Sequence, residues 1–416
     1  MRLRIHRGTR EIGGTCVELE NSGYRVLLDL GLPLDADDAD AVPLPEVAGL
    51  AAPDPSLLAI ILSHGHRDHW GLLPKVLTDV PLIMGRSVER IMRAAADFVP
   101  DAFAPKASSY LENGNPLHLG PFTVIPWLVD HSGFDAYALE ITAGGRRLFY
   151  SGDLRAHGRK GKLFERLVAH PPRDVDVMLM EGSSLGRLPD DGVFQTEEEL
   201  EQQFVARFDA TPGMALVACS AQNIDRVVTI YRAAKRTGRT LIVDAYATEI
   251  LKATGYDSIP RPEGDWSNIV VFIPQAQRIS LKKRGIASIV DSYRGFRLWP
   301  EQLAELASRS VMLFRGWMLK DLERANALDG ARVFWSQWEG YLKDGGGQKL
   351  KQECAVRNIP FEVIHTSGHA TPGDLKRIAA AIAPKRLIPI HTFERLRFPD
   401  LFENVLLADD GQWIEV

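Results

Sequence analysis

The chain has 416 residues, of which 45% are hydrophobic and 25% are charged, and its formal net charge is −5. These values are typical of a globular protein with a substantial core, and the length suits two domains or one domain with a large insertion. The negative net charge excludes a globally basic nucleic-acid-binding protein, so nucleic-acid contacts would need local basic surface or bound cations.

Cysteine usage and hydropathy restrict the class further. Cys16, Cys219 and Cys354 lie far apart and form no CxxC pair, which argues against a disulfide framework and a thiolate zinc site. The longest apolar run, LLAIIL, is much shorter than the roughly 20 residues of a membrane-spanning helix. The N-terminus has no apolar signal region, so we expect a cytoplasmic protein that does not contact the membrane.

The first half alternates short apolar or β-branched runs with Gly and Asp turn signals, a pattern typical of strands. The predicted strands are 16–20, 24–31, 57–63, 81–84, 122–129, 136–141, 146–153 and 176–183. Helical patterns over 70–79 and 87–98 fall between them. The fold class predicted for this half is α/β, with helices packed outside sheets.

From residue 195 the pattern changes to longer helices and strands. Thr196 is a predicted N-cap, and the segments 214–220, 223–238 and 240–246 indicate a βαβ unit with a parallel sheet. The stretch KDGGGQK, 343–349, is predicted to be a flexible turn or linker. Beyond it the pattern of the first half returns, with predicted strands at 361–367 and 386–392 on either side of a predicted helix at 372–383.

The strongest chemical signal is LSHGHRDHWG, 62–71, which places His64, His66, Asp68 and His69 between a predicted strand and a predicted helix. Imidazole and carboxylate are ligands that divalent transition metals prefer, and so dense a cluster is poorly explained as a polar loop. His64 and His66 are two residues apart in an extended segment and point the same way, whereas Asp68 and His69 can turn to a second ion.

Further ligands are needed to complete a metal shell, and three candidates stand at predicted strand ends. They are His131 in LVDHSGFDA, Asp153 in FYSGDLR and His391 in LIPIHTFE. Taken alone, each of these residues could also have a purely structural role. Asp after Gly is a common turn former, and an isolated His is more often structural.

The stretch HTSGHATPGD, 365–374, also allows two interpretations. Thr371 followed by Pro372 is a helix start, since a hydroxyl caps free N–H groups and proline tolerates the first turn. The other interpretation is that His365 and His369 lie on a loop that the chain holds open for chemistry. His365 stays open between a substrate contact and a structural strand-end residue.

The HxHxDH motif with a later His, Asp and His resembles the metallo-β-lactamase fold, an αββα sandwich. The resemblance implies that the two-zinc ligand set is His64, His66, Asp68, His69, His131, Asp153 and His391. It also implies that Asp29, in LLDLG, supports the ligand loop. Three further segments are similar to the motifs of the β-CASP branch. EGSS is similar to motif A and contains Glu181, SGHA is similar to motif B and contains His369, and IPIH is similar to motif C and contains His391.

Within that branch the chain resembles ribonuclease J through GTREIGGTCVELE, HSGFDA, SAQNIDRVVTIYRAAKRTGR and the closing segment 365–391. The implied domains are 1–194 and 356–416 for the metallo-β-lactamase part and 195–355 for a β-CASP insert. We expect the additional C-terminal domain of ribonuclease J to be absent. Thr392 and Phe393 depart from the Gly-Glu that often follows the last motif histidine.

The function implied is a zinc-dependent ribonuclease that cuts single-stranded RNA, internally or from the 5′ end, with two Zn²⁺ ions or with Mn²⁺. The implied catalytic residues are Asp68, Glu181 and His369, and the implied substrate contacts are Ser367, Gly368 and His365. The chain is expected to be a monomer or a homodimer.

Two alternatives stay open. A DNA nuclease of the same fold is disfavoured because DNA-acting relatives typically have valine where this chain has His391. A metallo-hydrolase of a small ester or thioester is opposed by the large insert and by Glu181 with His369. A binding subunit with a vestigial site is opposed by the complete ligand set. The basic segments 232–239 and 282–284 are more simply solvated helix faces, and Trp317, Trp335 and Trp338 are left unassigned between core and base stacking.

Overall fold

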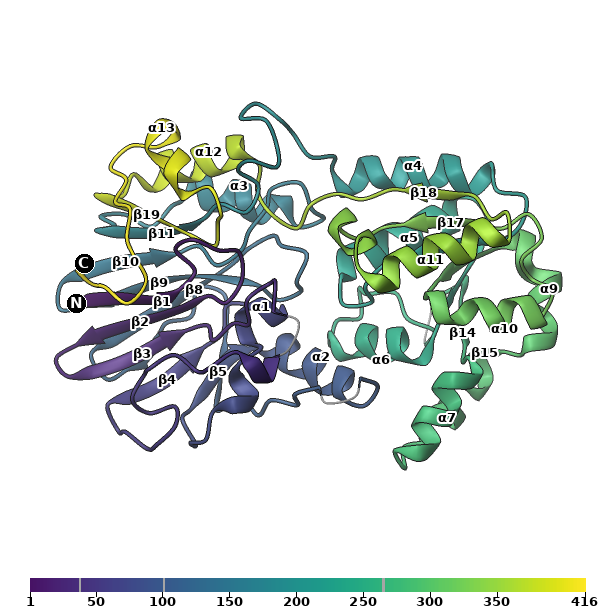
Figure 1. The fold of residues 1–416 in the computed structure, drawn as a ribbon, viewed down its shortest axis with the longest axis horizontal. Helices are drawn as coiled ribbons and strands as arrows, with labels where there is room; N and C mark the ends of the chain where they lie inside the picture. Colours follow the sequence, from purple (N-terminus) through teal and green to yellow (C-terminus); the bar gives the residue numbers. More distant parts are fainter. Residues whose placement is uncertain (37–38, 100–101, 264–265) are drawn as a thin grey trace. The chain divides into compact units, whose positions relative to one another are not determined.

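The computed structural model describes residues 1–36, 39–99, 102–263 and 266–416. By its internal contacts the chain forms two compact units. Unit 1 comprises Met1–Glu89, Pro105–Phe194 and Gly368–Val416, and unit 2 comprises Arg90–Ala104 and Gln195–Ser367. Figure 1 shows both units and labels most of their helices and strands.

Unit 1 contains two mixed sheets. The first has the order β20-β1-β2-β3-β4-β5-β6 and the second the order β19-β11-β10-β9-β8-β7. The strands of the first sheet are β1 Arg2–Arg7, β2 Cys16–Asn21, β3 Tyr24–Leu28, β4 Leu57–Ile61, β5 Leu82–Gly85, β6 Ser109–Leu111 and β20 Trp413–Glu415. Those of the second are β7 Leu117–Leu119, β8 Phe122–Leu128, β9 Tyr137–Ala143, β10 Arg146–Tyr150, β11 Val177–Glu181 and β19 Arg386–Ile390.

The two sheets pack face to face, because one buried cluster combines Leu19 and Ile61 of the first sheet with Leu139 and Ile388 of the second. Alternate side chains of a strand point to opposite faces, so Ala138 belongs instead to a second cluster with the helices α3 and α12. The α-helices that lie wholly in unit 1 are α1 Arg67–Trp70, α3 Gly161–Ala169, α12 Pro372–Ile382 and α13 Phe398–Leu401. Helices therefore cover the outer face of the second sheet (Figure 1).

Pairing in the second sheet brings three distant segments to one edge. β10 is parallel to β11, and β11 is parallel to β19, with Glu181 opposite Ile390. Because parallel strands end at the same edge, the residues after β10 and β19 emerge beside Glu181. This register places Asp153, Glu181 and His391 at one end of the sheet.

Unit 2 is built on a seven-stranded sheet in which every pair is parallel, in the order β15-β14-β13-β16-β12-β17-β18. Its strands are β12 Ala215–Ala218, β13 Thr240–Val243, β14 Ile269–Phe272, β15 Arg297–Leu298, β16 Ser310–Leu313, β17 Arg332–Trp335 and β18 Phe361–Val363. Its α-helices are α4 Glu197–Asp209, α5 Ile224–Arg236, α6 Ala245–Ala253, α7 Gln275–Lys283, α8 Ser288–Ser292, α9 Leu303–Leu306, α10 Leu319–Arg324 and α11 Gly345–Val356. The parallel βαβ arrangement predicted from residue 195 onward is present.

The ranges of the two units differ from the domain limits predicted from the sequence at two places. Residues 356–367 were assigned to the final part of the first domain, but β18 pairs in parallel with β17 and these residues group with unit 2. The helix α2, Arg86–Ala96, begins in unit 1 and continues into unit 2. The assignment of the units to the named domains remains a prediction.

Two local predictions were wrong. The segment 70–79 forms only the last residue of α1 and a short 3₁₀ turn at Leu73–Lys75, since proline and glycine interrupt the helical pattern. The stretch 343–349 is the start of α11, in which Gly345–Gly347 occupy the first turn. A Cβ on Gly347 would lie 2.2 Å from the carbonyl oxygen of Tyr341, so close approach explains this glycine.

The predicted cap at Thr196 is confirmed, because its hydroxyl accepts from Glu199 N and the Glu199 carboxylate accepts from Thr196 N. Thr371 likewise caps α12, with Pro372 in the first turn. Within the described residues, no helix combines the length and apolar character required to cross a bilayer.

Candidate metal centre

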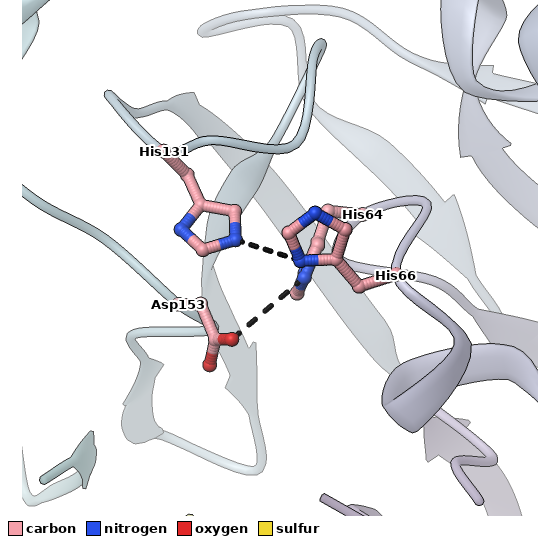
Figure 2. Close-up of side chains that lie close together, drawn as sticks. All are labelled: His64, His66, His131 and Asp153. Carbon is pink, nitrogen blue, oxygen red and sulfur yellow. Dashed lines mark hydrogen bonds and ion pairs between the residues drawn. The ribbon is translucent and has the colours of Figure 1, made fainter. Parts of the chain in front are cut away.

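The first donor group of unit 1 comprises His64, His66, His131 and Asp153, whose potential ligand atoms lie within 4.8 Å of one another. Figure 2 shows the three rings and the carboxylate pointing toward a common centre. His131 Nε2 and His66 Nδ1 are 3.0 Å apart, and His64 Nε2 is 3.7 Å from Asp153 Oδ2. One cation with ordinary Zn–N distances of about 2.0–2.1 Å fits between nitrogens so spaced.

The second donor group shares Asp153 and adds Asp68, His69 and His391. Nε2 of His69 lies 3.3 Å from Asp153 Oδ2, and Nε2 of His391 lies 3.6 Å from the same oxygen. The Asp68 carboxylate is 3.7 Å from His391 Nε2 and is partly accessible. The structure therefore brings all seven predicted metal ligands together in two overlapping groups.

The hydrogen bonding at these groups fits bound cations. Among the described residues, the structure gives no hydrogen-bond partner to Nε2 of His64, His69 and His391 or to either carboxylate oxygen of Asp153. All four side chains are at most 2% exposed. A buried polar atom without a hydrogen-bond partner costs about 1–3 kcal/mol of folding free energy, and more when it is charged. Because several such atoms lie close together here, they indicate an additional ligand.

The opposite nitrogens of the histidines are held by the protein. Nδ1 of His64 lies 3.0 Å from Ser63 Oγ, and Nδ1 of His131 is 2.6 Å from the carbonyl oxygen of Gly368. Nδ1 of His391 lies 3.1 Å from Thr15 Oγ1. Partners of this kind set the ring orientation, and at His131 the carbonyl oxygen at Nδ1 leaves the lone pair of Nε2 directed at the cluster.

Asp29 supports the ligand loop, as the resemblance implies. Its carboxylate accepts from Ser63 N (2.7 Å) and Ser63 Oγ (2.8 Å), lies 2.8 Å from His69 Nδ1 and accepts from the Tyr150 hydroxyl. Asp29 is fully buried, and its backbone has a φ of 57°, a conformation that Asp tolerates better than most residues. Four contacts on one carboxylate fix the start of the 62–71 segment.

The charge states of His64, His131 and Asp153 are those that metal ligands require, whereas His69 carries a proton in the metal-free protein. Burial, followed by the neighbouring imidazoles, lowers the pKa of His64 and His131 well below the usual range, so these rings stay neutral. Burial opposes ionisation of Asp153, but His391 and His69 hold its pKa well below the usual range. Burial opposes protonation of His69, but Asp153 and Asp29 raise its pKa well above the usual range. A cation would replace that proton.

His369 and Glu181 form a pair beside the second group. His369 Nδ1 lies 2.9 Å from Glu181 Oε2 and 3.8 Å from Asp153 Oδ2. The other oxygen of Glu181 accepts from Leu154 N at 2.9 Å, which anchors the carboxylate to the segment after Asp153. The His369 side chain is 22% exposed, so this imidazole is accessible while Glu181 is buried.

The three predicted substrate contacts have different surroundings. His365 belongs to unit 2, where its Nδ1 lies 3.4 Å from Arg226 Nη1, so a structural partner is present. Gly368 belongs to unit 1, and a Cβ at this position would lie 2.3 Å from Ser132 Oγ. The close approach of Ser132 accounts for the glycine without a ligand. Ser367 directly precedes Gly368 and is the last residue of unit 2.

Sequence reasoning missed the residues that hold the ligands. Ser63 and Tyr150 both contact Asp29, and the buried ion pair of Asp130 with Arg155 (3.3 Å) joins the residue before His131 to the segment after Asp153. Their position next to a candidate ligand or at a strand end is the only sequence signal they carry.

The basic segments divide into different environments. Arg239 is 7% exposed and donates to the carbonyl oxygens of Gly213, Ser310 and Thr211, so it is a structural residue. Arg236 pairs with Glu201 at 3.1 Å. The interpretation as a solvated helix face is therefore wrong for Arg239. Its contacts are with protein carbonyl groups, so they give no support for nucleic-acid binding.

Comparison with known proteins bears on the class of this geometry. Residues 9–189 match the model of the metallo-beta-lactamase superfamily, and this match confirms the predicted fold class. A solved protein of unknown function from Enterococcus faecalis V583 has the same fold, with a TM-score of 0.76, 21% identity and 99% coverage of both chains.

The relatives are more specific. The chain is 22% identical to Ribonuclease J of Helicobacter pylori (strain ATCC 700392 / 26695) over 98% of its length, and spans 60% of that relative. It is 26% identical to Ribonuclease J of Mycobacterium tuberculosis (strain ATCC 25618 / H37Rv) over its whole length, and spans 75% of that relative. The predicted resemblance to ribonuclease J is thereby confirmed, and the comparisons agree with the predicted enzyme class, a metal-dependent hydrolase.

Proposed function

We propose that this chain is a ribonuclease that hydrolyses phosphodiester bonds of single-stranded RNA with two divalent cations, Zn²⁺ or alternatively Mn²⁺. The observation that carries the proposal is the set of buried, unpartnered nitrogen and oxygen atoms in two donor groups that share Asp153. The choice of RNA as substrate rests on the similarity to proteins named Ribonuclease J.

The donor chemistry fits two such ions. His64, His66 and His131 would hold one ion, Asp68, His69 and His391 the other, and Asp153 both. When bound, such ions supply an activated water at neutral pH and stabilise the charge that develops on the phosphate oxygens. The carboxylate of Asp68 is partly accessible, which supports the proposal that it also acts as a catalytic residue.

His369 would donate the proton that the leaving oxygen needs. Its Nδ1 is occupied by Glu181, so Nε2 is the atom that can reach substrate. Burial opposes protonation, but the carboxylates of Glu181 and Asp153 raise the pKa of His369 to about 9, so the metal-free ring carries its proton at neutral pH. Glu181 is a positioning residue, because it is buried and acts through His369.

Ser367 and Gly368 immediately precede His369, and we propose them as phosphate contacts on that ground. The contact of His365 with Arg226 favours a structural role for this third residue. We also propose a cytoplasmic location, which agrees with three buried free cysteines, and either internal or 5′-directed cleavage by a monomer or homodimer.

The test uses the full chain with Zn²⁺, with Mn²⁺ and after chelation, on 5′-labelled single-stranded RNA, DNA of the same sequence and a thioester. We expect RNA cleavage only with metal, and a roughly 10²–10⁴-fold lower rate for His369→Ala with unchanged metal content. His118→Ala is the matched control, because His118 is an exposed histidine of β7 in the same unit.

Each other outcome has a definite meaning. Cleavage of the thioester but of neither nucleic acid contradicts the ribonuclease assignment. Preferential cleavage of DNA contradicts the substrate assignment. An unchanged rate in His369→Ala contradicts its role as proton donor while leaving the metal centre in place.

A further inference from the structure

Unit 2 contains a cavity of about 730 Å³ that lies apart from the metal ligands in sequence. The segments that follow four neighbouring parallel strands line it: Cys219 follows β12, Tyr246 follows β13, Trp317 follows β16 and Gln337 follows β17. Its volume is within the range of about 300–1,000 Å³ usual for small-molecule sites.

The topology of the sheet explains why a cavity forms at this point. From β12 the chain proceeds through β13 and β14 to β15 on one side, whereas it proceeds from β16 to β17 and β18 on the other. The direction of winding thus reverses around β16 and β12. In open parallel sheets the connections part at such a switch point and leave a crevice at the carboxyl ends of the strands, where ligands bind.

The cavity wall is rich in aromatic rings. Phe98, Tyr246, Phe314, Trp317 and Trp335 all contribute to it. Trp335 is buried, whereas Trp317 is 45% exposed, so its indole ring is not fully packed in the core. Tyr246 packs edge-on against Phe98 with ring centres 5.5 Å apart. Such a wall favours a flat ligand that stacks on a ring.

The charges at the cavity compensate one another. Arg315 forms an ion pair with the buried Asp244, and its guanidinium lies 4.9 Å from the ring centre of Tyr246. Asp244 also accepts from Ala247 N and from Gln277 Nε2, so its carboxylate is satisfied by the protein. Because the charge of Arg315 is already neutralised by Asp244, a phosphate group would gain little binding energy from this pair. A neutral ring could bind in the cavity without breaking the pair.

Polar groups lie next to the rings. Ser220 and Gln337 line the same cavity, and Gln222 donates to the Tyr246 hydroxyl at 2.9 Å. Hydroxyl and amide groups beside an aromatic wall suit a planar heterocycle that has donors and acceptors on its edge. Burial raises the pKa of the Cys219 thiol to about 12, so this wall residue adds no negative charge at neutral pH.

We propose that this cavity is a nucleobase-binding site in which the base stacks on Trp317. The inference uses unit 2 alone and holds whether or not the metal centre of unit 1 cuts RNA. The base belongs either to a free mononucleotide or to a single-stranded nucleic acid, and the chemistry that recognises it is the same.

The experiment measures binding to the full chain after chelation, so that no result depends on hydrolysis. The first arm titrates AMP, GMP, CMP and UMP, with ribose 5-phosphate as the probe without a base. The second arm titrates a fluorescent single-stranded RNA and an abasic strand of the same length. Thermal unfolding of every variant checks that it is folded.

We expect Trp317→Ala to weaken base-dependent binding roughly tenfold and Trp317→Phe to retain most of it, because stacking needs a ring at this position. Trp299→Ala is the matched control: Trp299 is another exposed tryptophan of unit 2, 46% exposed, and it does not contribute to the cavity wall.

The arms separate the two sources of the base. Weakened mononucleotide binding identifies a free nucleotide as the ligand, and weakening confined to the base-containing RNA identifies a base of the strand. The proposal is overturned if the probes without a base bind as well as those with one. It is equally overturned if no probe binds, or if Trp317→Ala and Trp299→Ala behave alike in both arms.

Discussion

The two units bury ionic clusters of opposite character. In unit 1, Asp153 and three histidines have buried atoms to which the structure gives no hydrogen-bond partner. In unit 2, Arg226 and Glu197 are equally buried, but each guanidinium nitrogen has an acceptor. Arg226 Nη2 lies 2.9 Å from Glu197 Oε1, and Thr229 Oγ1 donates to the other Glu197 oxygen at 2.7 Å.

The difference between the two clusters distinguishes a candidate ligand site, at Asp153, from a structural ion pair, at Arg226. A buried charge is stable only when it is paired, so a cluster that the protein completes by itself has no need of a ligand. The Arg226 cluster instead holds the chain together, because Ser336, which accepts from Arg226, also donates to the carbonyl oxygen of Ile364. The cluster at Asp153 has no such completion by the protein, which is the reason to propose it as a cation site.

The largest expected effect is at Asp153. Asp153→Asn removes the charge shared by both donor groups, so we expect metal content after dialysis to fall from about two ions per chain to one or none, with loss of detectable hydrolysis. Elemental analysis of the dialysed protein measures this. Asp176→Asn is the control, because Asp176 is a buried aspartate of the same unit that pairs with Lys385. Retention of both ions by Asp153→Asn would disprove the shared ligand.

The next effect is on folding. Arg226→Met leaves Glu197 buried without its partner, so we expect the free energy of unfolding to fall by about 3–5 kcal/mol while the folded protein keeps its metal. Urea unfolding followed by circular dichroism measures the loss. Adding Glu197→Gln to the same chain is expected to restore part of it. A loss below about 0.5 kcal/mol would show that the pair is unimportant for stability.

A smaller effect is expected behind the metal ligands. Asp29→Asn removes the charge that faces His69 Nδ1, and we expect metal affinity to fall by about 10–100-fold without loss of the fold. Competition with a chromophoric chelator measures the affinity. Tyr150→Phe removes one donor from the same carboxylate and is expected to have a weaker effect. Equal affinity in Asp29→Asn and the unaltered chain would refute a supporting role.

The smallest effect concerns proton affinity. The pKa of His369 is raised to about 9 chiefly by Glu181, against the effect of burial, so Glu181→Gln should lower it toward the ordinary histidine value. In metal-free protein the folded-state pKa exceeds the unfolded one. The stabilisation from this proton is therefore complete below about pH 6.5 and is lost as the pH rises through about 9. Imidazole NMR titration of the chelated protein measures both values, and an unchanged pKa in Glu181→Gln would reject the pairing.

Local patterns in the sequence predicted the local structure well where neighbouring residues decide it. The strands at 122–129 and 146–153 correspond to β8 and β10, and the hydroxyl caps at Thr196 and Thr371 are present. The dense motif of 62–71 identified ligand candidates because few other arrangements explain so many metal-binding side chains in one loop.

Predictions that depended on distant contacts were weaker. Residues 356–367 resemble the strands of unit 1 in composition, but β18 pairs with β17 of unit 2. Gly345–Gly347 read as a linker, yet they begin α11, where the first turn tolerates glycine and Gly347 fits against Tyr341. Composition does not encode which strand edge or which carbonyl a segment will meet.

The sequence by itself determined the residue types of the candidate metal centre and the alternation of strands and helices, because ligand chemistry and side-chain periodicity are local properties. Only the tertiary structure decided that Asp153, Glu181 and His391 meet at one edge, that Arg239 faces protein carbonyls, and that a cavity opens at the reversal of the unit 2 sheet. Those properties depend on strand order and register, which arise from contacts between segments far apart in the chain.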